Sequence, residues 1–201
     1  MVEIVKVLSF VVLGYILGSF PTGVIVGKKF KNIDIREHGS KNSGATNAYR
    51  VLGTKLGITV LLGDIFKGFL PLLVGYFFNL SENQLILVGV AAILGHTFSP
   101  FLNFKGGKGV ATSLGVFLFL VPEVIITLII IFIAVVYFSK YISLASIIVS
   151  VLFPILVFFY YTERKYTVFS VGIIIAAYII YKHKSNIVRL KNGTENKFYG
   201  K

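Results

Sequence analysis

Seven apolar runs separated by short polar stretches make up most of this 201-residue sequence, and they limit its possible folds more than any other feature. Apolar residues account for 56% of the chain and charged residues for only 14%, whereas a soluble domain carries about a quarter charged residues. Such runs predict helices that cross a membrane, where each helix satisfies its own backbone hydrogen bonds. The runs are Ile4–Gly27, Leu56–Phe78, Leu85–Gly95, Val110–Val121, Val124–Phe138, Leu144–Tyr160 and Thr167–Tyr181.

This pattern predicts an all-α, polytopic membrane protein with about seven transmembrane helices, which form one domain over residues 1–201. Several runs are shorter than the roughly 20 residues that cross a bilayer core. Either flanking residues extend them and the bilayer thins locally, or the third and fourth runs are half-length and meet a polar loop below the membrane surface. The first run has no convincing signal-peptide cleavage site, so we expect it to remain as a span, with Pro21 kinking its last turns.

Basic residues are distributed unevenly among the polar connections, and this predicts the orientation. Sixteen Lys and Arg residues fall on one side of the predicted spans, and only Lys6, Arg164 and Lys165 fall on the other. Because cytoplasmic connections are rich in Lys and Arg, we expect the N-terminus outside and the C-terminus in the cytoplasm. The three most unusual polar segments, residues 38–50, 95–112 and 182–195, then face the cytoplasm together.

Several classes of chemistry are missing from the sequence. The chain has no cysteine, so disulfides, thiolate nucleophiles and Cys-bound metals are excluded. It has no G-x-S-x-G or D-x-D motif, and no histidine is followed by the aspartate of a His-x-x-x-x-Asp dyad. We therefore expect no metal and no cofactor. The net charge of +12 resides between spans, which favours anionic lipid and phosphorylated metabolites over nucleic acid as partners.

The first polar segment, "HGSKNSGATNAYR", combines small residues with polar side chains. Small residues let backbone N–H groups approach an anion closely, and an arginine can grip a phosphate with two hydrogen bonds. The alternative is an ordinary solvated loop that leads into the second span. The candidate ligands for a phosphate are Ser40, Asn42, Thr46, Asn47 and Arg50.

The second polar segment, "GHTFSPFLNFKGGKGVAT", has the composition of an anion-binding loop. It is not a Walker A loop, because Lys108 is followed by Gly109. The glycines free the backbone, the lysines supply positive charge, and a helix starting near Val110 would point its N–H groups at the loop. The alternative is a positive-inside anchor, which would not need three glycines. The candidates are His96, Lys105, Gly106, Gly107, Lys108, Gly109 and Thr112.

The third polar segment, "KHKSNIVRLKNGTE", follows the last apolar run. If it is helical, His183, Asn186 and Arg189 share one face, which is either part of a site or plain interfacial polarity. Glu195 is one of few acids predicted on the cytoplasmic side, so pairing with a basic residue is expected.

Two charged residues, Asp64 and Lys67, lie inside the second run three residues apart. Charges within a span are candidates for function, and these two can neutralise each other. We favour a structural pair that supports the site over a proton relay.

These segments together resemble the bacterial acyl-phosphate:glycerol-3-phosphate acyltransferases. The matching stretches are "GSKNSGATNAYR", "GHTFSPFLNFKGGKGVATSLGV" and "HKSNIVRLKNGTE", with "GSFPTG" in the first run and "GDIFKG" in the second. They occur in the family's order and cover nearly the whole chain. One departure is Lys41, where many members have glycine, and it bears only on local loop geometry.

The resemblance implies transfer of a long acyl chain from acyl phosphate to the 1-hydroxyl of glycerol 3-phosphate, giving 1-acylglycerol 3-phosphate and phosphate. It assigns substrate binding and transition-state support to the residues that match the family's motifs. These are Ser40, Asn42 and Arg50 in the first segment, Lys105 and Lys108 in the second, and His183, Asn186 and Glu195 in the third. His183, Asn186 and Ser40 are the predicted catalytic residues, and we expect a monomer.

Two other classes of function stay open from the residues alone. One is a transporter of an organic phosphate, whose mark would be inverted repeats with paired broken helices. The other is a lipid-binding regulatory protein with a polybasic face, which would need neither the glycine loop nor the His183 face. Phosphate release that depends on both substrates would distinguish the enzyme from both.

Overall fold

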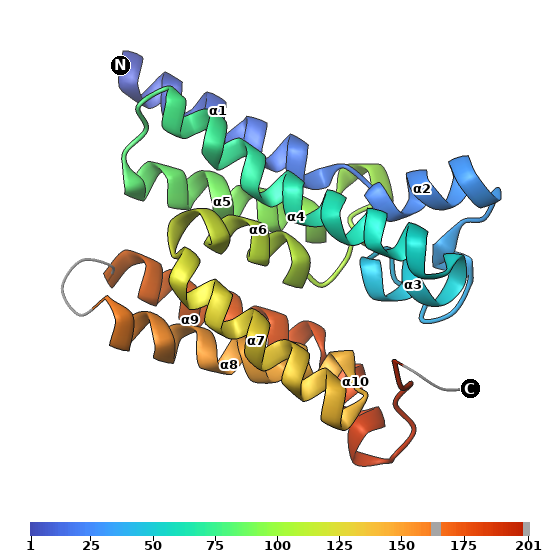
Figure 1. Ribbon diagram of the computed structural model, residues 1–201. Helices are drawn as coiled ribbons and strands as arrows, with labels where there is room; N and C mark the ends of the chain where they lie inside the picture. The colour runs from blue at the N-terminus through green and yellow to red at the C-terminus, as the bar shows by residue number, and fades with distance from the viewer. Residues whose placement is uncertain (162–165, 199–201) are drawn as a thin grey trace. The chain divides into compact units, whose positions relative to one another are not determined.

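The computed structural model describes residues 1–161 and 166–198, and within them all regular structure is helical. The predicted all-α fold is therefore confirmed. The chain divides into two compact units, unit 1 over residues 1–120 and unit 2 over residues 121–201 (Figure 1). Arg164, Lys165 and Lys201, which contribute to the predicted orientation, lie outside the described residues.

Unit 1 contains six α-helices and two short 3-10 helices. In chain order these are α1 (Val2–Ser19), α2 (Thr22–Lys31), η1 (Ile35–Glu37), α3 (Ala45–Leu52), α4 (Thr54–Phe77), α5 (Glu82–Thr97), η2 (Pro100–Leu102) and α6 (Val110–Leu120). Helices α1 and α5 pack along each other, and α4 packs against α6 and α3 (Figure 1). The short helix α3 lies within the first polar segment, where the sequence predicted only a loop.

Glycines allow the close helix crossings in unit 1, as is usual between membrane helices. A Cβ atom on Gly18 of α1 would lie 2.0 Å from the carbonyl oxygen of Ala92 on α5. A Cβ atom on Gly115 of α6 would lie 2.0 Å from the carbonyl oxygen of Ile65 on α4. Backbones therefore meet directly at both crossings.

The first apolar run is interrupted near Pro21, as the sequence predicted. Helix α1 ends at Ser19 and α2 begins at Thr22. Together they form a 30-residue apolar segment, Val2–Lys31, that is long enough to cross a membrane. Because α1 ends at Ser19, the last carbonyl groups before the interruption lack the i+4 donors of a continuous helix.

Unit 2 contains α7 (Pro122–Ser139), α8 (Ile142–Tyr160), α9 (Tyr166–Lys182) and α10 (Lys184–Lys191). Helix α8 packs against both α7 and α9. Helix α10 continues α9 after a bend of 57° at His183. The predicted helix is therefore formed over Lys184–Lys191, which holds Asn186 and Arg189, whereas His183 lies at the bend before it.

Length and composition make five helical segments in the described residues long enough to cross a membrane, or six if α9 and α10 count as one bent span. The third run recruits flanking residues, since α5 and η2 form a 21-residue segment, Glu82–Leu102. The fourth run stays short, with 11 residues in α6. The third run is thus extended by flanking residues, while the depth of both runs in the membrane stays a prediction.

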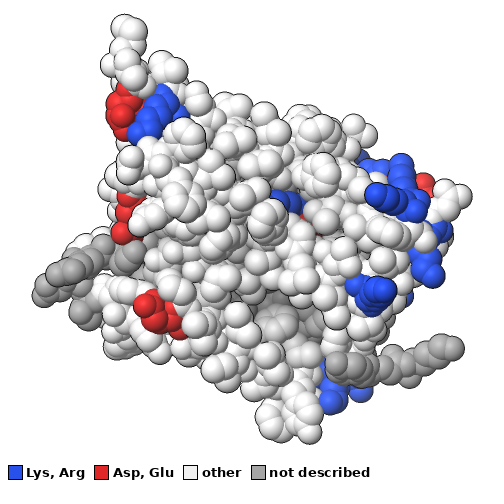
Figure 2. Space-filling view, turned by 45° about the horizontal axis from the view of Figure 1, so that its top comes forward, with Lys and Arg blue, Asp and Glu red and all other residues white. Residues whose placement is uncertain are grey.

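Exposed apolar side chains agree with a membrane environment. On α7, Ile126, Ile130 and Ile133 share one face and are 56%, 64% and 61% exposed. An apolar face of this size would be costly in water, so it is expected to contact lipid. Figure 2 shows Lys and Arg gathered over the end of unit 1 formed by α2 and α3. The orientation of the termini stays a prediction.

Candidate active site

The first polar segment is shaped by one buried side chain, Asn47 of α3, which is 1% exposed. Its Oδ1 atom accepts a hydrogen bond of 2.8 Å from the backbone N–H of Ser40. Its Nδ2 atom donates to three carbonyl oxygens, those of Ile35 at 2.7 Å, His38 at 3.1 Å and Asn42 at 2.8 Å. The side-chain donors of Asn47 are thus used by carbonyl groups of the protein. Asn47 therefore shapes the loop rather than contacting a phosphate directly.

We expect Asn47→Asp to loosen this loop, because a carboxylate would place negative charge against three carbonyl oxygens. Each carbonyl that loses its buried donor costs about 1–3 kcal/mol. The loop should therefore open more often, and tryptic cleavage after Lys41 should accelerate at least tenfold. Asn42→Asp is the matched control, since its Oδ1 atom accepts from the N–H of Gly44 at 3.0 Å and an aspartate oxygen can do the same. Equal cleavage rates in the two variants would contradict the assigned role of Asn47.

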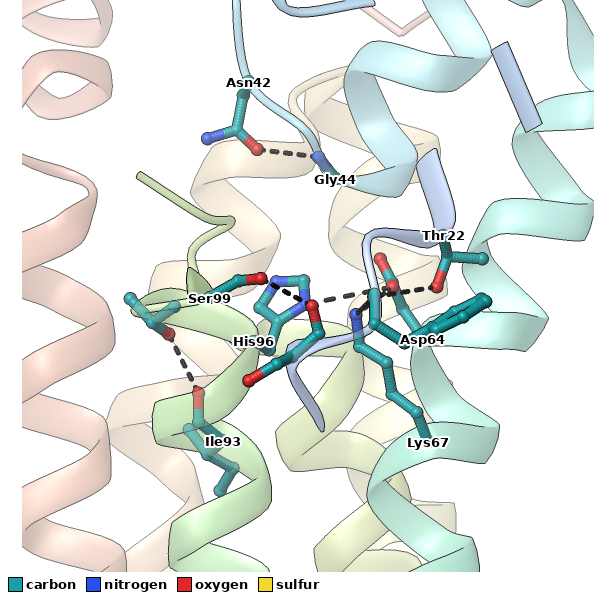
Figure 3. Close-up of polar contacts among 11 residues, drawn as sticks. Thr22, Asn42, Gly44, Asp64, Lys67, Ile93, His96 and Ser99 are labelled. Atoms are coloured by element: carbon teal, nitrogen blue, oxygen red, sulfur yellow. Dashed lines mark hydrogen bonds and ion pairs between the residues drawn. The ribbon is translucent and has the colours of Figure 1, made fainter. Parts of the chain in front are cut away.

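The other candidates of this segment lie around the start of α3. Asn42 and Gly44 form the turn that precedes the helix (Figure 3). Ser40 is exposed, Thr46 lies half-buried in the first turn of α3, and Arg50 lies half-buried in its last turn. The segment thus presents Ser40 and Asn42 ahead of a helix start, the arrangement expected for anion binding.

A charged cluster that the sequence did not predict lies just before this segment in the chain. Asp34 accepts two hydrogen bonds from the Arg36 guanidinium, at 3.0 and 2.7 Å, and its Oδ2 atom lies 3.7 Å from Lys28 Nζ. The Arg36 side-chain hydrogen bonds lower the pKa of Asp34 to about 2. Arg36 is thereby paired with Asp34.

In the second segment, Gly106 and Gly107 pair with the end of α5. The N–H of Gly106 donates to the carbonyl oxygen of Thr97 at 3.0 Å, and the N–H of Gly107 donates to that of His96 at 3.2 Å. A Cβ atom on Gly107 would lie 2.1 Å from His96 Nε2. These glycines therefore serve close packing against His96, and their N–H groups are not the phosphate donors that the sequence suggested.

The rest of this loop keeps the predicted features of an anion site. Helix α6 begins at Val110, so its first N–H groups point toward the loop. Lys105 is exposed and Lys108 is half-buried, while Gly109 adopts a φ of +90° that favours glycine. The hydroxyl of Thr112 is fully buried and has no hydrogen-bond partner among the described residues.

The two charges inside α4 form a buried pair, as the sequence predicted. Lys67 Nζ lies 2.8 Å from Asp64 Oδ1, and the two residues are 8% and 2% exposed. Lys67 Nζ also donates to the carbonyl oxygen of Phe20 at 2.8 Å. His96 Nδ1 lies 3.8 Å from the same Asp64 oxygen (Figure 3). His96 is buried in this cluster, where it packs against Gly107 of the loop.

The third segment, in unit 2, is organised around Glu195, which is 7% exposed. Its Oε1 atom accepts from Asn186 Nδ2 at 2.7 Å and from Ser143 Oγ at 2.9 Å, and its Oε2 atom accepts from Arg189 Nε at 2.7 Å. Burial alone would raise the pKa of Glu195, but the hydrogen bonds from Asn186, Arg189 and Ser143 together hold it below its ordinary value. The predicted pairing of Glu195 with a basic residue is confirmed.

His183 lies at the bend between α9 and α10 and is 3% exposed. Its Nδ1 atom lies 2.8 Å from the carbonyl oxygen of Ile179. A carbonyl only accepts, so in the neutral ring Nδ1 carries the proton and Nε2 carries the lone pair. Nε2 is therefore the atom that would accept a proton. In the described part of the chain, no three His, Asp or Glu side chains lie close enough to hold a metal ion.

The sequence matches a protein family described as "Glycerol-3-phosphate acyltransferase" over residues 8–193. A glycerol-3-phosphate acyltransferase of Fusobacterium nucleatum is 58% identical over 189 residues, which cover 94% of this chain and 96% of that protein. The Bacillus subtilis protein with the same description is 44% identical over 187 residues, covering 93% and 95% of the two chains.

Two solved structures are also similar. They are crystal structures of PlsY (YgiH), described as an integral membrane glycerol 3-phosphate acyltransferase, in a glycerol 3-phosphate form and a lysophosphatidic acid form. Their TM-scores are 0.89 and 0.86, each at 38% identity over 96% of this chain and 96% and 95% of those chains.

Proposed function

The chain belongs to the glycerol-3-phosphate acyltransferase family, and from this premise we propose that it transfers an acyl chain from acyl phosphate to the 1-hydroxyl of glycerol 3-phosphate. The products are 1-acylglycerol 3-phosphate (lysophosphatidate) and inorganic phosphate, and the step is the first acylation in phospholipid synthesis. The whole chain acts as one membrane-integral acyltransferase domain, since the family match spans both units.

The choice of donor follows from the resemblance of the three polar segments to the acyl-phosphate-dependent family, and their basic, glycine-rich composition supports it. Acyl phosphate is already activated, because phosphate is a good leaving group, so no covalent acyl-enzyme is needed. The enzyme has to bring two anions together and align a hydroxyl with a carbonyl. Arg50, Lys105, Lys108 and the first N–H groups of α6 are suited to offset that repulsion.

The proposed chemistry is a direct displacement. The 1-hydroxyl oxygen of glycerol 3-phosphate attacks the acyl carbonyl carbon, and the bond from that carbon to the phosphate oxygen breaks. A phosphate oxygen of a substrate accepts the hydroxyl proton, while Ser40, Asn186 and His183 orient the reacting groups and support the transition state. His183 Nε2 is the alternative base, since an imidazole has a suitable pKa.

Two substitutions of His183 separate these roles. In His183→Asn the amide can keep the bond to the Ile179 carbonyl that Nδ1 makes now, whereas His183→Gln places an amide where Nε2 lies. Neither amide is a base, so if His183 only binds and orients, we expect kcat within about tenfold of wild type and a higher KM. A loss of kcat greater than about a thousandfold in both variants would instead identify His183 as the base.

Glycerol 3-phosphate is soluble and enters from the cytoplasm, whereas the acyl tail of the donor lies between helices within the bilayer. This division fits a chain whose apolar helices contact lipid and whose polar segments carry the lysines. A monomer in the bacterial inner membrane, with the active site facing the cytoplasm, suffices for this reaction. Membrane lipid and the two substrates are the proposed partners.

The test is phosphate release by purified protein given palmitoyl phosphate, with and without glycerol 3-phosphate, and with palmitoyl-CoA in a parallel reaction. Release that requires both substrates, with lysophosphatidate formed and palmitoyl-CoA inert, is the expected result. Turnover with palmitoyl-CoA instead would overturn the proposed donor. Saturable binding of glycerol 3-phosphate without turnover of either donor would favour the organic-phosphate transporter.

A further inference from the structure

The stretches "GSFPTG" and "GDIFKG" have no part in the chemistry described so far, yet their residues meet at one buried place in unit 1. "GSFPTG" contains the interruption between α1 and α2, and "GDIFKG" contains Asp64 and Lys67. Two side chains from elsewhere in unit 1 occupy the exposed carbonyls of the interruption. Lys67 Nζ donates to the Phe20 oxygen at 2.8 Å, and Ser99 Oγ donates to the Ser19 oxygen at 2.6 Å. The Phe20 oxygen also accepts the N–H of Thr22 at 2.9 Å, so Lys67 adds a second donor to it, whereas the Ser99 hydroxyl holds the Ser19 oxygen.

The interruption lies directly against the first polar segment. A Cβ atom on Gly23, in the first turn of α2, would lie 2.1 Å from the carbonyl oxygen of Ser43. Ser43 sits between Asn42 and Gly44, the turn that starts α3 (Figure 3). Gly23 lies only three positions after Phe20 in the chain, and it contacts the turn directly.

The same cluster lies against the second polar segment. His96 Nδ1 is 3.8 Å from the Asp64 oxygen that Lys67 contacts, and the other side of the imidazole lies against Gly107. Ser99, whose hydroxyl holds the Ser19 carbonyl, accepts the N–H of Phe104 at 2.9 Å through its own carbonyl. The loop over residues 105–109, called the glycine-lysine loop here, is thus attached to this cluster at Phe104, just before it, and at Gly107 within it.

The cluster has almost no free space. Its residues surround a cavity of about 10 Å³, roughly the size of one water molecule. Phe20, Ser43, Lys67 and His96 are among the residues that line it. A displacement of the Phe20 carbonyl cannot be absorbed locally, so it must pass to Ser43 on one side and to His96 on the other.

We propose that Lys67, neutralised by Asp64, is a positioning residue for glycerol 3-phosphate. It fixes the interruption of the first span between Ser19 and Thr22, which we call the joint. Through the joint it sets the positions of the Asn42–Gly44 turn and the Lys105–Gly109 loop. The effect falls on glycerol 3-phosphate because the polar segments alone hold this small substrate, whereas the acyl donor is also held by its tail. The proposal rests on the proposed function.

A purely structural pair would be replaceable. Removing one member leaves a buried charge unpaired, whereas removing both with little change in volume commonly preserves a fold. We therefore expect the double variant Asp64→Asn, Lys67→Met to fold, but with the Phe20 carbonyl released. Its KM for glycerol 3-phosphate should rise at least about tenfold, while the KM for palmitoyl phosphate stays within about twofold of wild type.

A second, uncharged variant tests the same joint if the double variant does not fold. Ser99→Ala removes only the hydroxyl that holds the Ser19 carbonyl, and we expect the KM for glycerol 3-phosphate to rise about fivefold. Ser9→Ala is the matched control, because its hydroxyl bonds the Val5 carbonyl within α1, away from the interruption. Both KM values of the control should match wild type.

Calorimetric measurement of glycerol 3-phosphate binding to the same purified proteins distinguishes a failure of the positioning role from a failure of the proposed function. Wild-type turnover with an unchanged KM and Kd for glycerol 3-phosphate in folded Asp64→Asn, Lys67→Met or in Ser99→Ala would overturn the positioning role alone. If wild type binds glycerol 3-phosphate without turnover, a weaker Kd in these variants still supports the positioning role. If wild type neither turns over nor binds it, the proposed function fails and the positioning role falls with it.

Discussion

Glu195→Ala is expected to unfold the third polar segment and to abolish activity. The substitution removes the acceptor of three hydrogen bonds, from Ser143, Asn186 and Arg189. Ser143 and Asn186 are buried, so each would lose the hydrogen bond it donates to Glu195 where water has little access. Such losses cost about 4 kcal/mol in sum, which corresponds to a drop of roughly 10 °C in the thermal midpoint measured in detergent.

Glu195→Gln should fall between wild type and Glu195→Ala. Its amide oxygen can still accept from Ser143 and Asn186, but its NH₂ group would face the Arg189 Nε–H, which is also a donor. Glu37→Gln makes the same charge change at an exposed position and should leave the midpoint unchanged. A midpoint for Glu195→Ala within about 2 °C of Glu37→Gln would contradict the central role of Glu195.

The same carboxylate predicts a dependence on pH. Because the pKa of Glu195 in the folded protein lies below its ordinary value of 4.5, its ionised form stabilises the fold above pH 4.5. That stabilisation is lost as the pH falls below 4.5 and through the lowered pKa. The thermal midpoint of wild type should therefore fall more steeply below pH 4.5 than that of Glu195→Gln. Parallel curves would show that Glu195 contributes nothing to this dependence.

Gly106→Ala is expected to displace the glycine-lysine loop. The added Cβ atom would lie 2.0 Å from the carbonyl oxygen of His96 and 2.9 Å from that of Thr97. Both are backbone atoms at the end of α5, so no side-chain rotation can make room. The Gly106 N–H bond to Thr97 would break, and Lys105 and Lys108 would move with the loop. Overpacking of this kind costs about 3 kcal/mol, and the misplaced lysines should lower kcat/KM more than about a hundredfold.

Gly44→Ala is the matched control for stability, because its Cβ atom would meet only Asn42 Oδ1, at 3.1 Å. We expect the thermal midpoint to fall by several degrees in Gly106→Ala and to change little in Gly44→Ala. A folded Gly106→Ala protein with full activity would show that the loop can move without cost. The assigned packing of Gly106 against His96 would then be wrong.

Several features followed from the sequence because they depend on residues close together in the chain. The apolar runs predicted helices α4, α7, α8 and α9 to within a few residues, since one run forms one helix in a membrane. Asp64 and Lys67 were predicted to pair because residues three apart on a helix are neighbours, and they lie 2.8 Å apart. The start of α6 at Val110 was likewise predicted, from the beginning of the fourth apolar run.

Tertiary structure decided which groups each polar residue contacts. Asn47 was predicted to bind phosphate, yet its donors are used by carbonyls of its own segment. Gly106 and Gly107 were expected to offer N–H groups to an anion, but the end of α5 takes both. In each case the composition was suited to an anion, but composition does not say whether a closer protein carbonyl takes the same donor.

The sequence by itself determined the class of this protein, its helices and the polar segments that carry the family's motifs, because periodicity and charge act over a few residues. Only the tertiary structure placed Lys67 on the Phe20 carbonyl, 47 residues away, and Ser99 on the Ser19 carbonyl, 80 residues away. It also brought Ser143 to Glu195 across 52 residues. Such contacts depend on how helices cross, and glycines that let two backbones touch decide this only when both helices are in place.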